Sequence, residues 1–423
     1  MSYFRYLYDS RKTLLRIGFP AMVSRGTMMV WGVITIFIIR SLPEEAYAIY
    51  SVAKSLEMFG VLLGGGFLQD AILKLAAEGE GHREKQLANS GILLSLFFAF
   101  FSALLIIAGG GMIGSFYRPL DLTGIPVLLA GVVVSGTLSG LPRLLLLTVH
   151  RTRDVMLIDL LQFAVRSCII VVLIVTGALE TAHQIFTAMI IANILSMILG
   201  MVFSKQLFFP RAGISLARVW NVLSFAMVFM GASLAGFVYT RTDILMLGKI
   251  APGDVAAYGA SRSLAGMILM VVNAAKMILL PHVSRLWSQG RRSEVRKKVM
   301  STVLLAEIII LPAVVLYVLF PRQLLDIVYG GKYSENWDIL LILGALSLVR
   351  PFGSFFAAAS SAMGKPQYSL YSVIVSAVVN VTLNILLIPK YGGLGAAIAT
   401  AIAVIMGSAW MVYSSNRYIR ENA

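Results

Sequence analysis

Long apolar stretches separated by short polar segments run through the whole chain. Hydrophobic residues make up 58% of the 423 positions, and charged residues only 13%. A helix of about 20 apolar residues crosses the hydrocarbon core of a bilayer, so each stretch of this length predicts one membrane span. Twelve spans are predicted, six in each half: Thr13–Ile39, Ile49–Leu68, Ala88–Gly110, Gly124–Leu147, Val155–Val175 and Gln184–Phe203, then Val219–Tyr239, Ala256–Leu280, Val299–Phe320, Trp337–Ser361, Tyr368–Ile388 and Leu394–Tyr413. The pattern indicates an all-α polytopic membrane protein.

Positive charge lies mostly on one side of these predicted spans. The alternation of loops puts 21 lysines and arginines on the side of both termini and 6 on the other side. Cytoplasmic loops carry the excess of Lys and Arg, so both termini are expected in the cytoplasm. The net charge of +15 is mostly this bias, and without a basic soluble domain we expect no nucleic-acid partner. The first stretch is too long for a signal peptide and is expected to remain as the first span.

A short motif occurs once in each half of the chain. Tyr50-x-x-x-Lys54-Ser55-Leu56 returns 208 residues later as Tyr258-x-x-x-Arg262-Ser263-Leu264. A weaker echo is the run Ala21-Met22-Val23, which returns as Ala226-Met227-Val228. Six spans per half give both halves the same orientation, as in transporters built from parallel repeats. The sequence therefore predicts two six-helix lobes, residues 1–210 and 211–423.

Several cations lie inside the predicted spans, where a charge is costly and usually faces an interior cavity. The candidates for a cationic substrate-binding cavity are Arg25, Lys54, Arg166, Arg262, Lys276 and Arg350. An arginine can bond two phosphate oxygens at once through its planar fork, so such a cavity suits an anionic substrate. Acids in the spans are fewer, and the candidates for coupling to a proton or Na⁺ gradient are Glu57, Asp159 and Glu307.

Purely structural roles stay open for these residues. Lys54 and Glu57 stand three apart on one helix face and can neutralise each other. Asp159, Gln162 and Arg166 follow a similar pattern, in which an Asp–Arg pair with a supporting amide would need no substrate. The sequence alone does not choose between a cavity wall and a set of self-satisfied pairs.

The remaining charged positions divide by their depth in the spans. Arg25 lies about 12 Å into the first span at 1.5 Å per residue, where it lines the cavity or snorkels to the interface. Arg262, Asn273 and Lys276 share one stripe of a continuous helix, which favours a cavity wall. Arg350 precedes a proline and either lines the cavity or donates to the carbonyls that the proline frees. Asp70, Arg143, Arg241 and Asp243 are expected at the membrane interface, near the span ends.

The sequence offers no metal or cofactor motif. Cys168 is the only cysteine, and the four histidines fall singly near loops, so neither a disulfide nor a metal-ligand set is predicted. Gly64-Gly65-Gly66 inside the second span favours close helix packing or a kink over a phosphate-binding loop. No cofactor is therefore expected.

Motifs in the second half resemble a known transporter superfamily. They are Pro281-His282-Val283-Ser284-Arg285-Leu286 after the eighth span, Gly364-Lys365-Pro366 before the eleventh, Asn380 and Asn384 within it, and the run from Pro389 to Thr400. These resemble the multidrug/oligosaccharidyl-lipid/polysaccharide exporter superfamily, and within it the polysaccharide (Wzx-type) flippases. The resemblance implies two six-helix bundles arranged in a V that translocate an undecaprenyl-pyrophosphate-linked oligosaccharide.

The same resemblance assigns roles to three of the cations. Related lipid II flippases use cavity arginines on their first, second and eighth helices, and Arg25, Lys54 and Arg262 occupy the corresponding helices here. Lysine on the second helix is a departure, because it offers a point charge in place of a fork. Lipid II flippases also typically have fourteen helices, whereas this chain has room for twelve.

The expectation from sequence is a flippase of the cytoplasmic membrane without catalytic chemistry. Its partners would be an anionic lipid-linked glycan, membrane lipids and polysaccharide polymerase or assembly proteins, with the protein itself a monomer. An antiporter of drugs or organic cations, the main alternative, would favour an acidic cavity, and residues 18–39 contain no acid. A membrane-embedded glycosyltransferase or polymerase would need a sizeable outer loop, and the longest one expected here is Pro321–Asn336.

Overall fold

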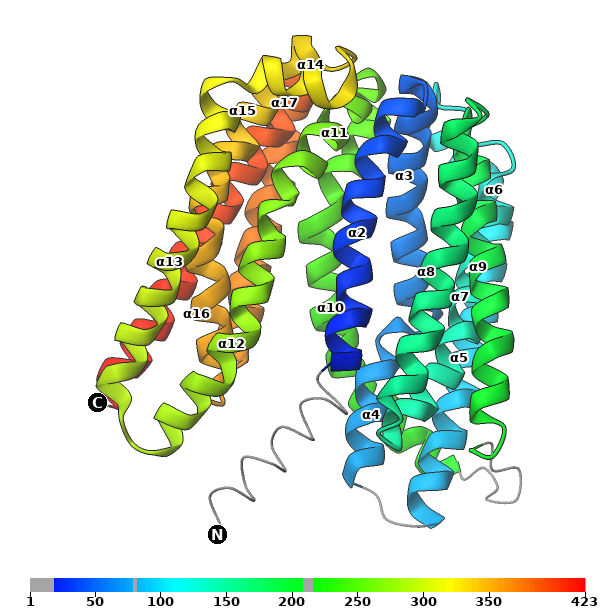
Figure 1. Ribbon diagram of the computed structural model, residues 1–423, viewed down its shortest axis with the longest axis vertical. Helices are drawn as coiled ribbons and strands as arrows, with labels where there is room; N and C mark the ends of the chain where they lie inside the picture. The colour runs from blue at the N-terminus through cyan, green and yellow to red at the C-terminus, as the bar shows by residue number, and fades with distance from the viewer. Residues whose placement is uncertain (1–18, 79–81, 208–215, 423) are drawn as a thin grey trace. The chain divides into compact units, whose positions relative to one another are not determined.

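The structure is a computed structural model that describes residues 19–78, 82–207 and 216–422. These ranges are helices joined by short turns and contain no strand (Figure 1). Ten helices in them are long and apolar enough to cross a membrane, or eleven if one bent pair is counted as a single span. The predicted all-α polytopic membrane fold is thus confirmed. Residues 13–18 of the first predicted span lie outside the described ranges.

The helices form two units, residues 1–234 and 235–423, which divide within the long helix α10 (Leu216–Ile250). The lobe boundary expected at residues 210 and 211 falls outside the described residues, and the twelve-span, two-lobe arrangement stays a prediction.

Unit 1 holds the helices α2 to α9 and the first part of α10. Their bounds are α2 Phe19–Ser41, α3 Glu44–Val61, α4 Leu68–Glu78, α5 His82–Ala108, α6 Gly110–Phe116, α7 Ile125–Thr148, α8 Thr152–Val175 and α9 Ala182–Ser204. Local sequence sets where several of them start. Thr181 and Gln184 form a reciprocal capping box at the start of α9, and Pro126 occupies the first turn of α7, where its missing N–H costs nothing.

The predicted second span is broken by its three glycines. α3 ends at Val61, a π-helical segment covers Leu62–Gly66, and α4 continues from Leu68. Gly65 has a φ of 95°, which a residue with a Cβ rarely adopts. A Cβ on Gly64 would meet Val133 of α7 at 2.8 Å, so the segment is both a kink and a close packing contact. The sequence expectation for Gly64-Gly65-Gly66 is confirmed.

Unit 2 contains the rest of α10 and the helices α11 to α17. Their bounds are α11 Val255–Gly266, α12 Ile268–Ser288, α13 Arg292–Leu319, α14 Pro321–Tyr329, α15 Trp337–Ala345, α16 Arg350–Ala362 and α17 Gln367–Glu421, with single 3-10 turns at Pro252–Asp254, Ser334–Asn336 and Leu346–Leu348. Its apolar core joins Val299, Val303 and Ala306 of α13 to Phe355 and Phe356 of α16.

The 55-residue element α17 folds back on itself at Gly392, whose φ is 52° and ψ −128°. Hydrogen bonds across it run in antiparallel order: Ser372 Oγ donates to the Gly407 carbonyl at 2.8 Å, and Ser376 Oγ to the Ala403 carbonyl at 3.1 Å. The Gly393 amide donates to Asp254 at 2.7 Å and closes the turn. The two arms cover the ranges expected to be the last two spans.

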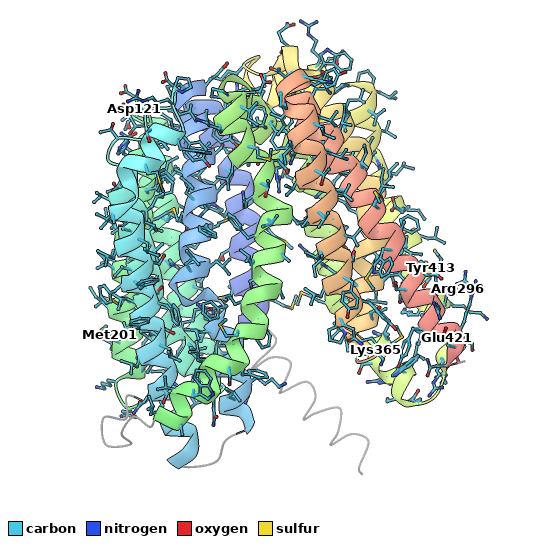
Figure 2. All side chains as sticks on the ribbon, turned by 180° about the vertical axis from the view of Figure 1, so that it is seen from behind. Asp121, Met201, Arg296, Lys365, Tyr413 and Glu421 are labelled. Carbon is cyan, nitrogen blue, oxygen red and sulfur yellow. The ribbon has the colours of Figure 1, made fainter. Side chains whose placement is uncertain are left out.

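One end of unit 2 gathers three segments that sequence alone assigned to the same side of the membrane. The Arg292 guanidinium donates to the Asn422 carbonyl, and the Lys365 ammonium lies 5.2 Å from the ring centre of Tyr418. Trp287 packs on the same tyrosine ring, with the ring centres 5.4 Å apart. Figure 2 shows Arg296, Lys365 and Glu421 at this end. The helix hairpin around residue 290, the turn before α17 and the end of α17 therefore lie together at one end of unit 2.

Candidate substrate cavity and buried ion-pair network

Unit 1 encloses a cavity of about 280 Å³ among α3, α4, α5, α7, α8 and α9. The polar side chains at its wall are two cations, one carboxylate, three amides and two hydroxyls: Lys54, Arg166, Glu57, Gln69, Gln162, Asn193, Ser95 and Thr137. The remaining lining is small or apolar, including Gly65 and Gly66 from the broken span. The kink in the second span thus forms part of the cavity wall.

Lys54 and Glu57 form an ion pair on the inner face of α3. The Lys54 Nζ lies 2.5 Å from a Glu57 carboxylate oxygen, and the two side chains are 29% and 8% exposed. The pair anticipated from their three-residue spacing is therefore present, and both members also line the cavity. Their net charge is zero, so this pair alone does not make the cavity cationic.

Arg166 is the second cation of the cavity wall, which therefore carries one more cation than carboxylates. Its guanidinium carbon lies 3.5 Å from the ring centre of Trp31 on α2, a cation–π contact that joins α8 to α2. The Nε atom is shielded from solvent and has no hydrogen-bond partner within the described ranges. Because this guanidinium makes no ion pair in the described ranges, it can donate hydrogen bonds to an anionic group that enters the cavity.

The alternative in which Asp159 pairs with Arg166 is not observed in the described part of the chain. Asp159 on α8 accepts a hydrogen bond from the Arg143 Nε of α7 at 2.8 Å, so it is neutralised across the helix interface. Gln162, one turn further along, donates to Asn193 of α9 at 2.6 Å, and Asn193 donates to Ser135 of α7 at 3.0 Å. Spacing on one helix predicts which side chains share a face, but a neighbouring helix supplied the closer cation.

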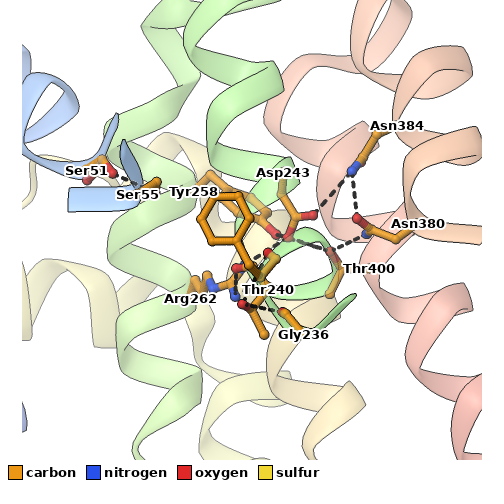
Figure 3. A network of polar contacts seen from close by, with 11 residues as sticks. Ser51, Ser55, Gly236, Thr240, Asp243, Tyr258, Arg262, Asn380, Asn384 and Thr400 are labelled. Carbon is orange, nitrogen blue, oxygen red and sulfur yellow. Dashed lines mark hydrogen bonds and ion pairs between the residues drawn. The ribbon is translucent and has the colours of Figure 1, made fainter. Parts of the chain in front are cut away.

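Unit 2 contains a buried network centred on Asp243 of α10 (Figure 3). Asp243 is fully buried. It accepts hydrogen bonds from Arg262 at 2.8 Å and Tyr258 at 2.5 Å, both on α11. Thr400 at 3.0 Å and Asn384 at 3.2 Å, from the two arms of α17, complete the set. One carboxylate thus ties together four helical segments.

Asp243, which was expected near the outer end of a span, is buried inside unit 2 and does not face solvent. The seventh span was expected to end at Tyr239, but α10 continues to Ile250. Asp243 therefore stands inside the helix, two turns before its end. Arg262 neutralises it and also donates to the Thr240 carbonyl at 2.5 Å. The partners of Asp243 come from other helices, so the local sequence did not show that this acid would be neutralised inside the protein.

One amide oxygen in this network, on Asn384, accepts no hydrogen bond from the described residues. Asn384 donates to Asn380 at 3.0 Å, and Asn380 in turn donates to Thr400 at 3.4 Å. The Asn384 Oδ1 atom is buried and has no hydrogen-bond partner among the described residues. Hard cations are bound by carboxylate, hydroxyl and amide oxygens of this kind. No cluster of three His, Cys, Asp or Glu suited to a metal occurs in the described part of the chain.

Of the other sequence-predicted cations, Arg262 belongs to the Asp243 network and Arg350 interacts electrostatically with it, whereas Lys276 does not line the cavity of unit 1. The structure divides the eighth span at Met267 into α11 and α12, with Arg262 bound to Asp243 and Asn273 exposed. Lys276 of α12 is half-buried and makes no ion pair in the described ranges. Arg350 begins α16, and its shielded Nε has no partner there, so donation by this nitrogen to freed carbonyls is not observed. The side chains of Arg25 and Asp70 lie outside the described residues.

Comparison with known proteins decides the family. A family described as polysaccharide biosynthesis protein matches residues 80–338, which is more than half of the chain. The chain belongs to this family. The expected membership of the multidrug/oligosaccharidyl-lipid/polysaccharide exporter superfamily is thereby confirmed, together with the relatives and structures below.

The relatives of this family member are distant in sequence. It is 23% identical to the probable flippase AglR of Haloferax volcanii over 90% of this chain and 78% of that protein. It is 23% identical to a putative O-antigen transporter of Shigella flexneri over 88% of this chain and 90% of that protein. The match to Agl15 of H. volcanii, a probable low-salt glycan biosynthesis flippase, is 21% over 50% of this chain and spans about half of that relative, 46%.

Solved structures show the same fold. The lipid II flippase MurJ in an inward closed conformation gives a TM-score of 0.74 at 15% identity, covering 94% of this chain and 87% of that one. An inward-facing multidrug resistance MATE transporter gives 0.72 at 16% identity, covering 95% and 98%. A fold shared by a lipid flippase and a drug transporter leaves the substrate to be argued from the site.

Sequence reasoning missed four functional candidates in this family member. Asp243 and Thr400 received no site role, and the two asparagines of α17 entered only as part of a resemblance. The signal was present in the spacing, because Asn380 and Asn384 are one turn apart and share a helix face. The other usable signal was an acid inside the apolar run that surrounds Asp243.

Proposed function

We propose that the protein is a flippase that moves a lipid-linked anionic oligosaccharide across the cytoplasmic membrane by alternating access, without catalytic chemistry. Family membership and the relatives named as flippases or as an O-antigen transporter support this class. The single observation that carries it is the cavity of unit 1, where Arg166, which has no ion pair among the described residues, and the Lys54–Glu57 pair lie among three amides.

The chemistry of that cavity matches a phosphorylated sugar. A guanidinium without a carboxylate partner can bond two oxygens of one phosphate group. Amide side chains donate to and accept from hydroxyls, which are the groups that sugars present. Glu57 holds Lys54 in place, so the net positive charge of the wall comes from Arg166. A cationic drug would meet this guanidinium and be repelled.

The finer substrate is an oligosaccharide repeat unit on undecaprenyl pyrophosphate, as in O-antigen, capsule or exopolysaccharide assembly. The lipid would stay in the bilayer while the pyrophosphate and first sugars enter the cavity. Polymerase or assembly proteins would receive the product on the outer face, and the flippase would act as a monomer. These identifications rest on the family and on the charge of the cavity.

The orientation in the membrane follows from the Lys and Arg bias. The excess of 21 over 6 puts both termini and the helix hairpin around residue 290 in the cytoplasm. Reporter fusions at Ala423 and Gln289 should read cytoplasmic, and a fusion at Lys332 should read external. An external reading at Ala423 would contradict this orientation.

Coupling to an ion gradient is assigned to Asp243 in this proposal. All three acids, Glu57, Asp159 and Asp243, are paired with a cation, but Asp243 also lies beside the amide oxygen of Asn384, which is buried and has no hydrogen-bond partner among the described residues. The residues that would hold Na⁺ are Asp243, Thr400 and Asn384, and the ion would supply positive charge when Arg262 moves away. A ligand that binds only the folded state raises stability, so Na⁺ should protect wild-type protein against thermal unfolding and should not protect Asp243→Asn.

The decisive test combines complementation with direct binding. In a strain that lacks its flippase, Arg166→Ala should abolish surface polysaccharide, and Arg322→Ala, a change at an exposed pair, should leave it intact. Loss of a charge-assisted hydrogen bond of about 1.5–3 kcal/mol lowers affinity about ten- to a hundredfold. Purified Arg166→Ala should show that loss for undecaprenyl-pyrophosphate-linked glycan, and inorganic pyrophosphate should compete in wild type. Competition by cationic dyes with no binding of the glycan would favour the antiporter.

A further inference from the structure

Glu307 is an acid in the middle of α13 that neither the cavity nor the Asp243 network uses. It lies in the run Val303-Leu304-Leu305-Ala306-Glu307-Ile308-Ile309-Ile310, in which all seven remaining residues are apolar. Both of its carboxyl oxygens are shielded from solvent, and neither has a hydrogen-bond partner among the described residues. Its side chain is half-buried because its methylene groups, not its oxygens, reach the surface.

The packing around this stretch of α13 is apolar. Val299, Val303 and Ala306 are buried against Val272 and Leu279 of α12, with Phe355 and Phe356 of α16 in the same cluster. The opposite face of α13 presents Leu304 and Ile308, which are 56% and 69% exposed and suited to lipid. Glu307 lies at the border between these two faces.

No charged group on the packed helices compensates this acid. The charged and titratable side chains on α13 and on the elements that contact it are Arg292, Glu294, Arg296, Lys297, Lys298 and Tyr317 on α13, Lys276, His282 and Arg285 on α12, Arg322, Asp326 and Tyr329 on α14, Asp338 on α15, Arg350 on α16, and Tyr368, Tyr371, Lys390, Tyr391, Tyr413, Arg417, Tyr418, Arg420 and Glu421 on α17. None of them makes a hydrogen bond or ion pair with Glu307 in the described residues. On α13 itself, Tyr317 donates to the Leu264 carbonyl.

We propose that Glu307 is a proton-binding site, held as the neutral carboxylic acid while unit 2 is packed as described. A carboxylate without donors in an apolar environment is strongly disfavoured against its protonated form. The acid can therefore release its proton only when movement of α13 against α12 or α16 brings water or a cation to the oxygens. This contrasts with Asp243, whose carboxylate lies 2.8 Å from the Arg262 guanidinium. The assignment does not depend on what the protein transports.

A protonated acid next to lipid has a distinctive reactivity. Dicyclohexylcarbodiimide is apolar and adds to protonated carboxyls: the carboxyl proton moves to one carbodiimide nitrogen, and the carboxyl oxygen bonds to the central carbon. The adduct rearranges to a stable acylurea without an oxidant, a reductant or a leaving group. The exposed Leu304 and Ile308 beside Glu307 give the reagent access from the bilayer.

The test is labelling of the full-length protein in lipid nanodiscs near neutral pH, read by peptide mass spectrometry. Glu307 should carry the adduct at about tenfold or higher yield than the ion-paired Glu57 and Asp243, because only the neutral acid reacts. Glu307→Gln should remove the adduct, and Glu335→Gln, at an exposed pair, should leave it unchanged. An unlabelled Glu307 in wild type, or equal labelling of all three acids, would overturn the proposal.

A second readout guards against a variant that fails to fold. Infrared spectra of wild-type protein in D₂O should contain the carbonyl stretch of a carboxylic acid, and Glu307→Gln should lose it while keeping the wild-type amide bands. If Glu307→Gln does not fold, Glu307→Asp should keep the acid band at a shifted frequency. Absence of the band from well-folded wild type near neutral pH would also refute a neutral Glu307.

Discussion

The two copies of the repeated motif use their cations differently. Lys54 in unit 1 bonds to Glu57, one turn along its own helix, whereas Arg262 in unit 2 reaches Asp243 on the preceding helix. The residue that precedes Asp243 by the repeat distance is Thr35, whose hydroxyl bonds to its own helix at the Trp31 carbonyl. The carboxylate that pairs with the repeated cation therefore lies on the same helix in unit 1 and on the preceding helix in unit 2.

The Lys54–Glu57 pair lines a cavity, whereas the Arg262–Asp243 pair holds several helices together. The pair in unit 1 involves one helix and borders a cavity, so the Lys54 ammonium can turn toward a ligand without unpacking anything. The network in unit 2 joins α10, α11 and both arms of α17 through a fully buried carboxylate. We infer that the first cation serves binding and that the second chiefly serves cohesion and ion coupling.

The largest effect is expected from breaking the network of unit 2. Arg262→Ala leaves a fully buried carboxylate without its cation, which costs about 3–5 kcal/mol when one partner of a buried pair is removed. The variant should therefore unfold at lower temperature in detergent and accumulate poorly in membranes. Arg262→Ala combined with Asp243→Asn should regain much of the stability, because no buried charge is left. Wild-type stability of the single variant would show that Asp243 does not depend on this arginine.

A smaller cost is expected at the corresponding pair of unit 1. Lys54→Ala leaves Glu57 buried without its partner, but the cavity gives the carboxylate access to water, so we expect a loss of about 1–3 kcal/mol. Function should fall much further than stability, as judged by surface polysaccharide against membrane protein level, and Lys54→Arg should retain both. If Lys54→Ala is as unstable as Arg262→Ala, the two pairs play the same structural role.

Local features of this chain could be predicted from its sequence, because their causes lie within one or two helical turns. The apolar stretches gave the spans, the three-residue spacing gave the Lys54–Glu57 pair, and three adjacent glycines gave the break at Gly65. Each of these depends on neighbours along the chain. The fold class followed from the same patterns.

Partners from other helices could not be predicted in this way. Asp159 shares a helix face with Arg166, yet Arg143 of α7 lies closer in space. Asp243 was read as interfacial because its neutralising groups come from α11 and α17, 15 to 157 residues away in sequence. The cavity is lined by six helices and by the π-helical segment between α3 and α4. The sequence therefore gave candidate cations, and the structure shows which of them line the cavity.

Arg166, which has no carboxylate partner among the described residues, allows a further test of the unit 1 cavity. Trp31→Ala removes the ring beneath Arg166, and a cation–π contact of this kind contributes about 0.5–2 kcal/mol. Stability should fall by that amount, and Trp31→Phe should fall less because its ring attracts a cation more weakly. Pyrophosphate binding should weaken in step, since the guanidinium loses its fixed position. Thermal unfolding and ligand titration measure the two effects, and unchanged binding in Trp31→Ala would mean that the ring does not orient Arg166.

The smallest effect is expected where an ion pair is open to water. Arg322 and Glu335 lie 2.6 Å apart in unit 2, with side chains 57% and 84% exposed. The unpaired partner in Arg322→Ala or Glu335→Gln is solvated at once, so stability should change by less than about 0.5 kcal/mol. Measured beside Arg262→Ala and Lys54→Ala, this pair completes a series in which exposure rises while ion-pair distance hardly changes. If the loss of stability followed the ion-pair distance and not the burial of the pair, the inferred difference between the two units would be wrong.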